Sequence, residues 1–177
     1  KNEQEINNVL DQIKKESFSI ASIDKKPYRR SPYAPFTTST MQQEASKKLG
    51  FSASRTMQIA QRLYQGIDLE GDTVGLITYM RTDGTNISQD AIKECRNYID
   101  KEIGKKYLPS EARNYSGKKA KNAQEAHEAI RPTDILRTPD KMKSILDKDQ
   151  ARLYELIWNR TLASQMENAE YERCTLE

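Results

Sequence analysis

The chain has 177 residues, of which 36% are hydrophobic and 31% are charged, and its net charge is +3. This length suits one domain or one and a half, and the hydrophobic content excludes a disordered chain of modest net charge. No apolar run approaches the roughly 18 residues that cross a bilayer, which excludes a membrane-spanning protein. The sequence opens at Lys1, without a methionine or a secretion signal, inside a helical pattern, so we expect a fragment excised from a longer chain.

The cysteines and the histidine are too few for a disulfide framework or a zinc site. Cys95 and Cys174 stand far apart, and His127 is the one histidine of the sequence. Neither a Cys-x-x-Cys pair nor a histidine cluster is present, so we expect no metal site in this chain. Isolated cysteines are typical of a reducing compartment, which predicts a cytoplasmic protein.

Positive charge is concentrated between residues 25 and 66. This stretch holds eight lysines and arginines against one glutamate, a net charge of +7 that leaves −4 for the rest of the chain. A basic segment inside a near-neutral protein is typical of a surface that binds a polyanion such as nucleic acid. A solvated face whose counter-charges lie elsewhere in the fold would give the same pattern.

The first predicted elements are a helix over 3–16, from apolar residues at helical spacing, and a short strand over 17–23, from weak alternation. Three prolines within 26–35 keep the next segment extended, because proline fixes φ and restricts the residue before it. We therefore expect a domain boundary in this segment.

A pair of short helices is predicted next. One begins at a Ser39 cap and ends at Gly50, and the other begins at a Ser54 cap and ends at Gly66, with an apolar stripe inside each. Two short helices joined by residues 50–53 resemble a helix-turn-helix.

Further helices are predicted from near Ser88, from Pro139 at a first helical position, and from the capping box formed by Asp147 and Gln150. Residues 169–177 read as the start of another strand. The predicted fold is mainly α, with a helix-turn-helix-like element and short β segments at both ends.

Between the second and third helical segments, an apolar run leads into a polar cluster that contains Tyr79, Arg81 and Asp83. If the backbone is extended there, Tyr79 and Arg81 point to the same side. A tyrosine hydroxyl can attack a phosphodiester and hold the phosphoryl group covalently, but it needs help to lose its proton. A neighbouring guanidinium can lower that cost and stabilise charge on the phosphate oxygens. A core tyrosine whose hydroxyl is satisfied would give the same local pattern.

Four blocks of sequence stand in a distinctive order and spacing: RSPYAPFTTST (30–40), RTMQIAQ (55–61), LITYMRTDGTN (76–86) and AHEAIRPT (126–133). In these blocks the chain resembles bacterial DNA topoisomerase I of the type IA family, and the resemblance covers nearly the whole chain. The string TYMRTD (78–83) is among the family's most diagnostic. Gly84 departs from the family pattern, because many relatives carry serine there, and this affects only the local turn.

The resemblance implies that Tyr79 is the nucleophile. In the family this tyrosine attacks one DNA strand and becomes joined to the 5′ phosphate, which leaves a free 3′ hydroxyl. The other strand passes through the gap and the ester is reversed, which relaxes negatively supercoiled DNA without ATP. Arg81 matches the family's arginine next to the nucleophile, and we assign it phosphate positioning and charge stabilisation.

Four further residues are candidates for contact with DNA. The resemblance implies that His127 binds a phosphate, with a core or capping histidine as the alternative. Arg131 would share the face of His127 only in a helix, which Pro132 argues against, so its role stays open. Arg55 and Arg62, on the second of the paired helices, are expected to make salt-dependent contacts with the backbone of single-stranded DNA.

The resemblance also places the acidic residues, the general-acid lysine and the Mg²⁺ site of the family in a Toprim domain that precedes this segment. Asp147 and Asp149 form the one Asp-x-Asp pair, and we interpret it as a helix cap rather than a metal site.

From the resemblance we expect residues 1–33 to end an arch-domain segment, 34–160 to form the helical domain with the nucleophile, and 161–177 to start the returning arch segment. The expected partners are DNA, mainly single-stranded, and the parent chain's Toprim domain, in a nucleoid-associated protein.

Two other classes of protein remain open at this stage. A non-enzymatic DNA-binding module of the helix-turn-helix type would bind duplex DNA selectively and would be indifferent to Tyr79→Phe. A scaffold domain whose basic stretch meets an acidic protein would show no affinity for oligonucleotides at low salt.

Overall fold

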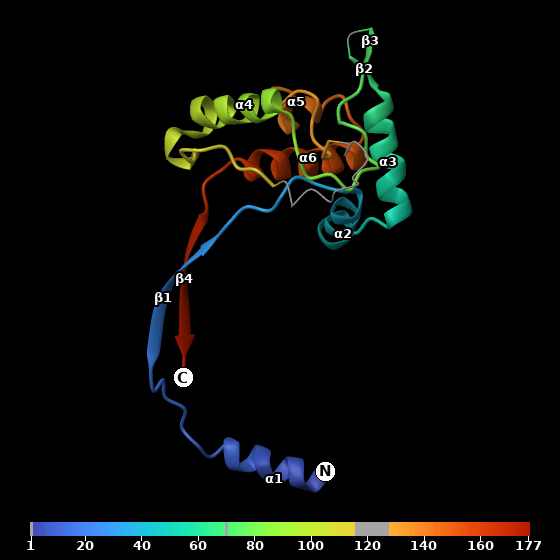
Figure 1. Ribbon diagram of the computed structural model, residues 1–177. Coiled ribbons are helices and arrows are strands. Elements are labelled where there is room, and N and C mark those ends of the chain that lie inside the picture. Colours follow the sequence, from blue (N-terminus) through green and yellow to red (C-terminus); the bar gives the residue numbers. More distant parts are fainter. Residues whose placement is uncertain (1, 70, 116–127) are drawn as a thin grey trace, which may run out of the picture. The chain divides into compact units, whose positions relative to one another are not determined.

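A computed structural model describes residues 2–69, 71–115 and 128–177 (Figure 1). The chain divides into two compact units, one formed by the residues up to Arg30 together with Ala169–Glu177, and the other by Ser31–Asn168. The predicted segments divide at 33/34 and 160/161. The helical unit continues beyond residue 160 because its last helix, α6, runs to Ser164.

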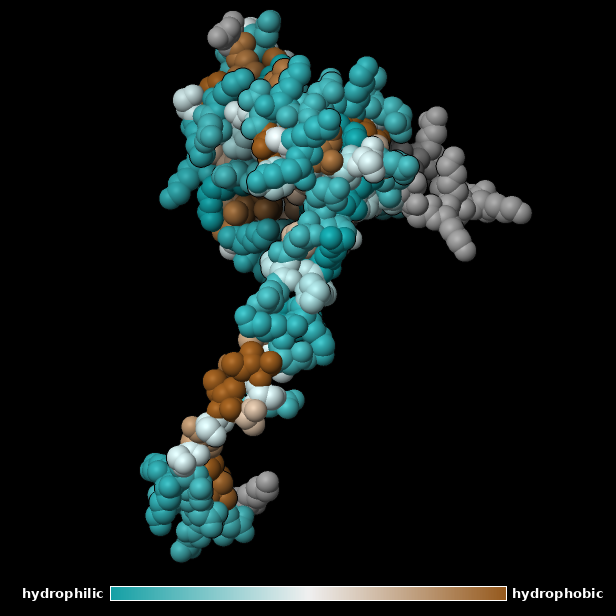
Figure 2. Space-filling view, turned by 90° about the vertical axis from the view of Figure 1, so that its left-hand side faces the viewer, coloured by the Kyte–Doolittle hydropathy of each residue, from teal (hydrophilic) through white to brown (hydrophobic). Residues whose placement is uncertain are grey.

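The first unit holds the helix α1 (Glu3–Ile13) and an antiparallel ribbon of β1 (Ile23–Arg30) and β4 (Ala169–Leu176). Every residue of both strands is exposed, and apolar side chains of α1 also face solvent. Figure 2 shows apolar surface, in brown, on this unit. Cross-strand pairs stabilise the ribbon. A guanidinium nitrogen of Arg29 lies 2.6 Å from a carboxylate oxygen of Glu170, and the ring centroids of Tyr28 and Tyr171 lie 6.4 Å apart.

The strand predicted over 17–23 is wrong, because β1 begins only at Ile23. The pairing explains the difference. Ile23 faces Leu176 and Arg30 faces Ala169, so the position of the strand is set by a partner far along the chain. Pro27 is tolerated within β1 because a two-stranded ribbon leaves one edge of each strand without a ladder partner. The strand predicted at 169–177 is confirmed by β4.

The second unit is mainly helical. Its elements are α2 (Thr38–Leu49), α3 (Ala53–Gln65), the hairpin strands β2 (Ile67–Leu69) and β3 (Asp72–Val74), α4 (Gln89–Tyr98), α5 (Pro139–Met142) and α6 (Lys148–Ser164). A π-helical turn (Ile99–Ile103) and a 3-10 turn (Lys105–Tyr107) follow α4. The prediction of a mainly α fold with minor β at both ends is confirmed for the described part of the chain.

The core of this unit is built on α6. The helices α2, α3 and α5 contact it (Figure 1). The ring of Tyr98, at the end of α4, meets that of Trp158 edge-to-face, with the ring centroids 5.5 Å apart. Leu153, Tyr154 and Ile157 of α6 are completely buried. A fully buried tyrosine needs a partner for its hydroxyl, and that of Tyr154 donates to the Arg137 carbonyl at 2.6 Å.

Several predicted helix ends are confirmed. Gly50 ends α2 in the left-handed region at φ +73°, where glycine has no Cβ penalty. The side chain of Ser88 caps α4, and Asp147 and Gln150 form the capping box of α6. Pro139 stands at the start of α5, where its missing N–H removes no helical hydrogen bond.

Two predicted caps are wrong by two residues. The cap of α2 is Thr37, which forms a capping box with Thr40, rather than Ser39. The cap of α3 is Ser52, whose hydroxyl accepts from the Arg55 N–H, rather than Ser54. The two helices follow one another and contact each other, and a helix-turn-helix function for them stays a prediction. Among the described residues, no helix has both the length and the apolar character that crossing a membrane requires.

Candidate active site around Tyr79

Tyr79 lies on the loop 75–86, which we call the tyrosine loop, and the segment 128–133 fixes one side of this loop. The Thr78 N–H donates to the Arg131 carbonyl at 2.9 Å, and the Arg131 N–H donates back to the Thr78 hydroxyl at 3.0 Å. That hydroxyl in turn donates to the Ala129 carbonyl at 2.7 Å. An isolated β-bridge pairs Ile77 with Pro132. The backbone just before Tyr79 is therefore held by residues 129–132.

The start of α2 fixes the other side of the loop. The Thr38 hydroxyl lies 2.7 Å from the Met80 carbonyl and 3.0 Å from the Thr82 carbonyl, and it accepts from the Thr82 N–H at 2.8 Å. The Thr82 hydroxyl accepts from the Gly84 N–H at 3.0 Å, within the loop itself. The Thr38 hydroxyl thus bonds to the peptide groups on both sides of Arg81.

Side chains along this loop alternate between solvent and core. Tyr79 is 38% exposed and Arg81 is exposed, whereas Met80 is completely buried and Thr82 is 7% exposed. The backbone bends through residues 78, 80 and 81 instead of forming a strand, so the alternation comes from the anchors and not from a sheet. Tyr79 and Arg81 are both exposed, but the extended backbone on which their predicted convergence depends is absent, so that convergence stays a prediction.

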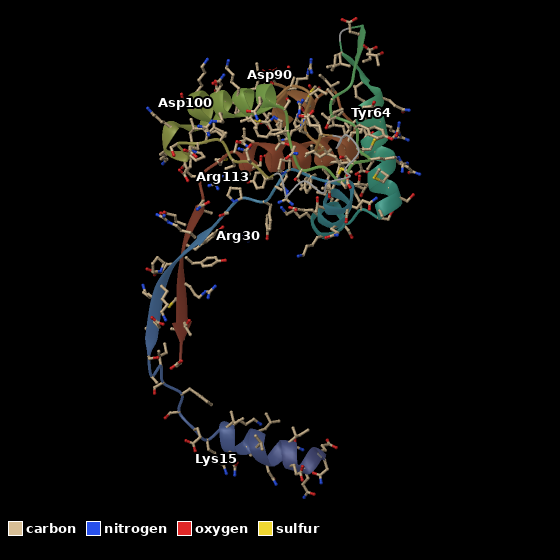
Figure 3. The ribbon with its side chains drawn as sticks, viewed as in Figure 1. Lys15, Arg30, Tyr64, Asp90, Asp100 and Arg113 are labelled. Carbon is tan, nitrogen blue, oxygen red and sulfur yellow. The ribbon has the colours of Figure 1, made fainter. Side chains whose placement is uncertain are left out.

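The end of α3 approaches the loop from a third direction. After α3 the chain turns through β2 and β3, and the Leu76 N–H donates to the Leu63 carbonyl at 2.8 Å. The ring of Tyr64 lies beside that of Tyr79, with centroids 5.4 Å apart and planes at 65°. Figure 3 shows Tyr64 on α3.

These contacts bring together parts of the sequence blocks noted above. The Ile130 N–H donates to the Phe36 carbonyl, which ties 128–133 to the segment before α2. The tyrosine loop is bonded to 128–133 and to Thr38, the first residue of α2. The block 55–61 lies in α3, where Ile59 and Ala60 are buried in the core. Apart from Arg30, the described parts of the four blocks therefore belong to the helical unit that contains Tyr79.

Arg131 forms an ion pair within its own segment. Its guanidinium donates to both carboxylate oxygens of Glu128, at 2.6 and 3.1 Å, and to the Pro132 carbonyl at 2.8 Å. Glu128 also accepts from the Ser88 N–H at 2.7 Å, at the cap of α4. The arginine side chain is 15% exposed, and residues 128–133 are not helical. This arrangement favours a structural role for Arg131 over a phosphate contact.

The other predicted DNA contacts lie on α3 or outside the described residues. Arg55 is ion-paired with Asp149 and lies over the ring of Phe51, 5.7 Å from the centroid. Arg62, seven residues on and therefore on the same face of the helix, is exposed. His127 lies outside the described residues.

The interpretation of Asp147 and Asp149 as capping residues agrees with their contacts. The Asp147 carboxylate accepts from the N–H groups of Asp149 and Gln150, both at 2.9 Å, and Asp149 faces Arg55. In the described ranges, no three His, Cys, Asp or Glu side chains gather in a way that could hold a metal ion.

Three residues that contact the tyrosine loop or the segment 128–133 were not predicted: Thr38, Tyr64 and Glu128. Thr38 and Glu128 belong to the sequence blocks noted above, but nothing in the local pattern distinguishes them from their neighbours. Each makes its contact with a residue that lies between 15 and 44 positions away in the chain. Only the fold reveals that they support the tyrosine loop.

All of the chain, residues 1–177, matches the model of the DNA topoisomerase family, and the protein belongs to this family. DNA topoisomerase 1 of Rickettsia felis is 56% identical over 167 residues, which cover 94% of this chain and 21% of the relative. The Helicobacter pylori protein of the same name is 52% identical over 172 residues, which cover 97% of this chain and 23% of the relative.

Full-length topoisomerase I from Thermotoga maritima has the same fold over this region. The TM-score is 0.78 at 40% identity, over 96% of this chain and 26% of that one. The resemblance inferred from the four sequence blocks is confirmed. The chain spans between about a fifth and a quarter of the length of these relatives.

Proposed function

We propose that this chain is the part of a type IA DNA topoisomerase that carries the nucleophile, and that Tyr79 is this nucleophile. The observation that carries the proposal is the placement of Tyr79, which is exposed, as Arg81 is, on a loop whose backbone is anchored from two sides. An exposed phenol on a fixed backbone can approach a phosphate with little loss of conformational entropy on reaching the attack geometry. The family membership of the chain supports the same assignment.

The proposed reaction is a reversible transfer of a phosphodiester to the tyrosine. The Tyr79 hydroxyl gives up its proton and its oxygen forms a bond to the phosphorus, while the bond from phosphorus to the 3′ oxygen of the preceding nucleotide breaks. The 3′ oxygen takes up one proton, so protons balance over the step. The product is a 5′-phosphotyrosine and a free 3′ hydroxyl. Arg81 stabilises the charge that grows on the non-bridging oxygens. Because one ester replaces another, rejoining needs no ATP, and strand passage before rejoining relaxes negatively supercoiled DNA.

The remaining catalytic groups belong, in this proposal, to the Toprim domain of the parent chain. Mg²⁺ held there would supply charge neutralisation at the DNA phosphates. The role of this chain is to orient the tyrosine, position the phosphate through Arg81 and contact single-stranded DNA through Arg55, Arg62 and His127. A phosphate contact by Arg131 would require its ion pair with Glu128 to open. The proposed location is the cytoplasm, in association with the nucleoid.

The test uses the parent protein with its Toprim domain. A labelled single-stranded oligonucleotide is incubated with the protein and Mg²⁺, the mixture is quenched with detergent, and the covalent protein–DNA adduct is measured beside Tyr79→Phe. We expect an adduct that disappears in the variant. An adduct of equal yield in the variant would move the nucleophile to another residue. Binding without adduct in either protein would favour a DNA-binding module built on α2 and α3.

The chain of 177 residues by itself should not relax supercoiled plasmid, because half of the proposed catalytic groups lie outside it. Incubation of the purified chain with negatively supercoiled DNA and Mg²⁺, followed by gel electrophoresis, measures this directly. ATP-independent relaxation by the chain alone would contradict the division of catalytic groups.

A further inference from the structure

Tyr64 packs its ring against the ring of Tyr79. We propose that Tyr64 is a positioning residue, which holds the Tyr79 ring in the orientation from which its hydroxyl reaches the phosphate. This rests on the proposed role of Tyr79 as nucleophile. The ring centroids lie 5.4 Å apart and the planes meet at 65°, an edge-to-face arrangement that aromatic pairs prefer.

The hairpin after α3 brings the two tyrosines together although they are 15 positions apart. Tyr64 lies in the last turn of α3, and β2 and β3 return the chain so that Leu76 bonds to Leu63. Gly75 allows the close approach, because a Cβ at this position would lie 2.7 Å from the Tyr64 carbonyl oxygen. The base of the hairpin is therefore packed directly against the backbone of Tyr64.

Backbone anchors alone do not orient the Tyr79 side chain. The hydrogen bonds to Thr38 and Arg131 fix the peptide groups around Tyr79 and involve no atom of its side chain, and Tyr79 is 38% exposed. An exposed tyrosine can populate more than one χ1 rotamer. A ring packed edge-to-face against it favours one of them, by roughly two- to tenfold for a pair of this kind.

The core does not need the Tyr64 ring. Tyr64 is 40% exposed, whereas its helix buries Ile59, Ala60 and Leu63. Tyr64 is not part of the hydrophobic core cluster, so its replacement should leave that core intact. The contact is made by the ring, which predicts that phenylalanine can replace the tyrosine.

The experiment measures single-turnover cleavage by the parent protein with Mg²⁺ and a labelled single-stranded oligonucleotide. We expect Tyr64→Ala to lower the rate of adduct formation at saturating oligonucleotide by roughly two- to tenfold while the Kd for the oligonucleotide stays unchanged. Tyr64→Phe should restore the rate. Tyr107→Ala is the matched control, because Tyr107 is 39% exposed and lies outside the tyrosine loop, and it should cleave like the wild type.

Each other outcome overturns the proposal. A Tyr64→Ala rate equal to that of the wild type would show that the ring contact orients nothing. Equal loss in Tyr64→Phe and Tyr64→Ala would assign the effect to the hydroxyl, and a raised Kd with an unchanged rate would make Tyr64 a DNA contact. Thermal melting of each variant separates these results from a loss of folding. If the wild-type protein forms no Tyr79-dependent adduct, the proposed function fails before Tyr64 is tested.

Discussion

Thr38 and Thr82 are joined by hydrogen bonds in both directions, although 44 positions separate them. The Thr38 N–H donates to the Thr82 carbonyl at 2.8 Å, and the Thr82 N–H donates to the Thr38 hydroxyl at 2.8 Å. The first N–H groups of a helix have no partner within the helix. Here the tyrosine loop supplies an acceptor for one of them, and the start of α2 in turn supplies an acceptor for the N–H of Thr82.

Replacement of Thr38 by valine should therefore damage both stability and cleavage. The valine keeps the volume but leaves the buried Thr82 N–H without its acceptor, which costs about 1–3 kcal/mol. We expect a lower free energy of unfolding in denaturant for the chain and slower adduct formation by the parent protein. Thr38→Ser retains the hydroxyl and should stay within about 1 kcal/mol of the wild type. A valine variant as stable and active as the wild type would show that the loop is held by other contacts.

Glu128 links Arg131 to the start of α4, and its removal should destabilise the unit. Glu128→Ala takes away the acceptor of the Ser88 N–H and leaves the half-buried Arg131 unpaired, which should cost about 1–3 kcal/mol. A double-mutant cycle with Arg131→Ala should give a coupling free energy of about 1 kcal/mol in denaturant unfolding.

The matched control for this cycle is the pair of Arg29 and Glu170 in the ribbon, whose side chains are 72% and 68% exposed. Its coupling should be smaller, because exposed ion pairs are solvated and screened. Equal coupling in the two pairs would contradict the structural role of Glu128. A lower salt dependence of DNA binding in Arg131→Ala would instead support the phosphate contact.

Cys95 should resist alkylation that Cys174 accepts. Burial raises the pKa of the Cys95 thiol to about 12, against an ordinary value of 9.0, whereas Cys174 is exposed. Since the thiolate is the reactive form, iodoacetamide at pH 8 should modify Cys174 first and Cys95 only after unfolding, as read by mass spectrometry of peptides. Rapid modification of Cys95 in the folded chain would contradict its burial.

The same shift makes stability depend on pH in the alkaline range. Between about pH 9 and 12 the unfolded chain has lost the Cys95 proton while the folded chain keeps it, so this thiol lowers the free energy of unfolding as the pH rises. Cys95→Ala should reduce this pH dependence, as measured by denaturant unfolding of the variant and the wild-type chain at a series of pH values. A pH dependence equal to that of the wild type would contradict the raised pKa of Cys95.

The helix ends that could be predicted from the sequence are those formed by contacts between neighbouring residues. Gly50, Ser88 and Asp147 act through their own side chains or backbone, and their predicted roles are confirmed. The start of α2 was missed because four consecutive hydroxyl residues, 37–40, compete for the cap. The choice of Thr37 leaves Thr38 as the first helical residue, where it bonds to Thr82, a distant contact that local sequence does not encode.

The candidate site also combines residues that local sequence predicts with residues that act through distant contacts. Tyr79 and Arg81 were predicted from a string of residues that carries the family pattern, and the structure places both on the exposed side of the loop. Tyr64 packs against Tyr79 of the loop, and Glu128 joins the segment 128–133, which holds the loop, to the start of α4. Neither has a spacing or composition that distinguishes it from the other tyrosines and glutamates of the chain.

The exposed face of α3 should contribute to DNA binding through Arg62 more than through Arg55. Each phosphate contact to a single strand adds about 0.7 to the slope of log K against log salt. Arg62→Gln should lower this slope by about that amount when a labelled single-stranded oligonucleotide is titrated with the chain and followed by fluorescence anisotropy. Arg55→Gln should lower it less, because Asp149 already faces that guanidinium.

Lys93, exposed on α4, supplies the control, since Lys93→Gln removes the same charge from a helix that carries none of the predicted contacts. Its slope should match that of the wild type. If all three variants lower the slope equally, the effect is one of net charge, and α3 has no special part in binding. If Arg55→Gln has the larger effect, the ion pair with Asp149 opens on binding and α3 presents both arginines to the strand.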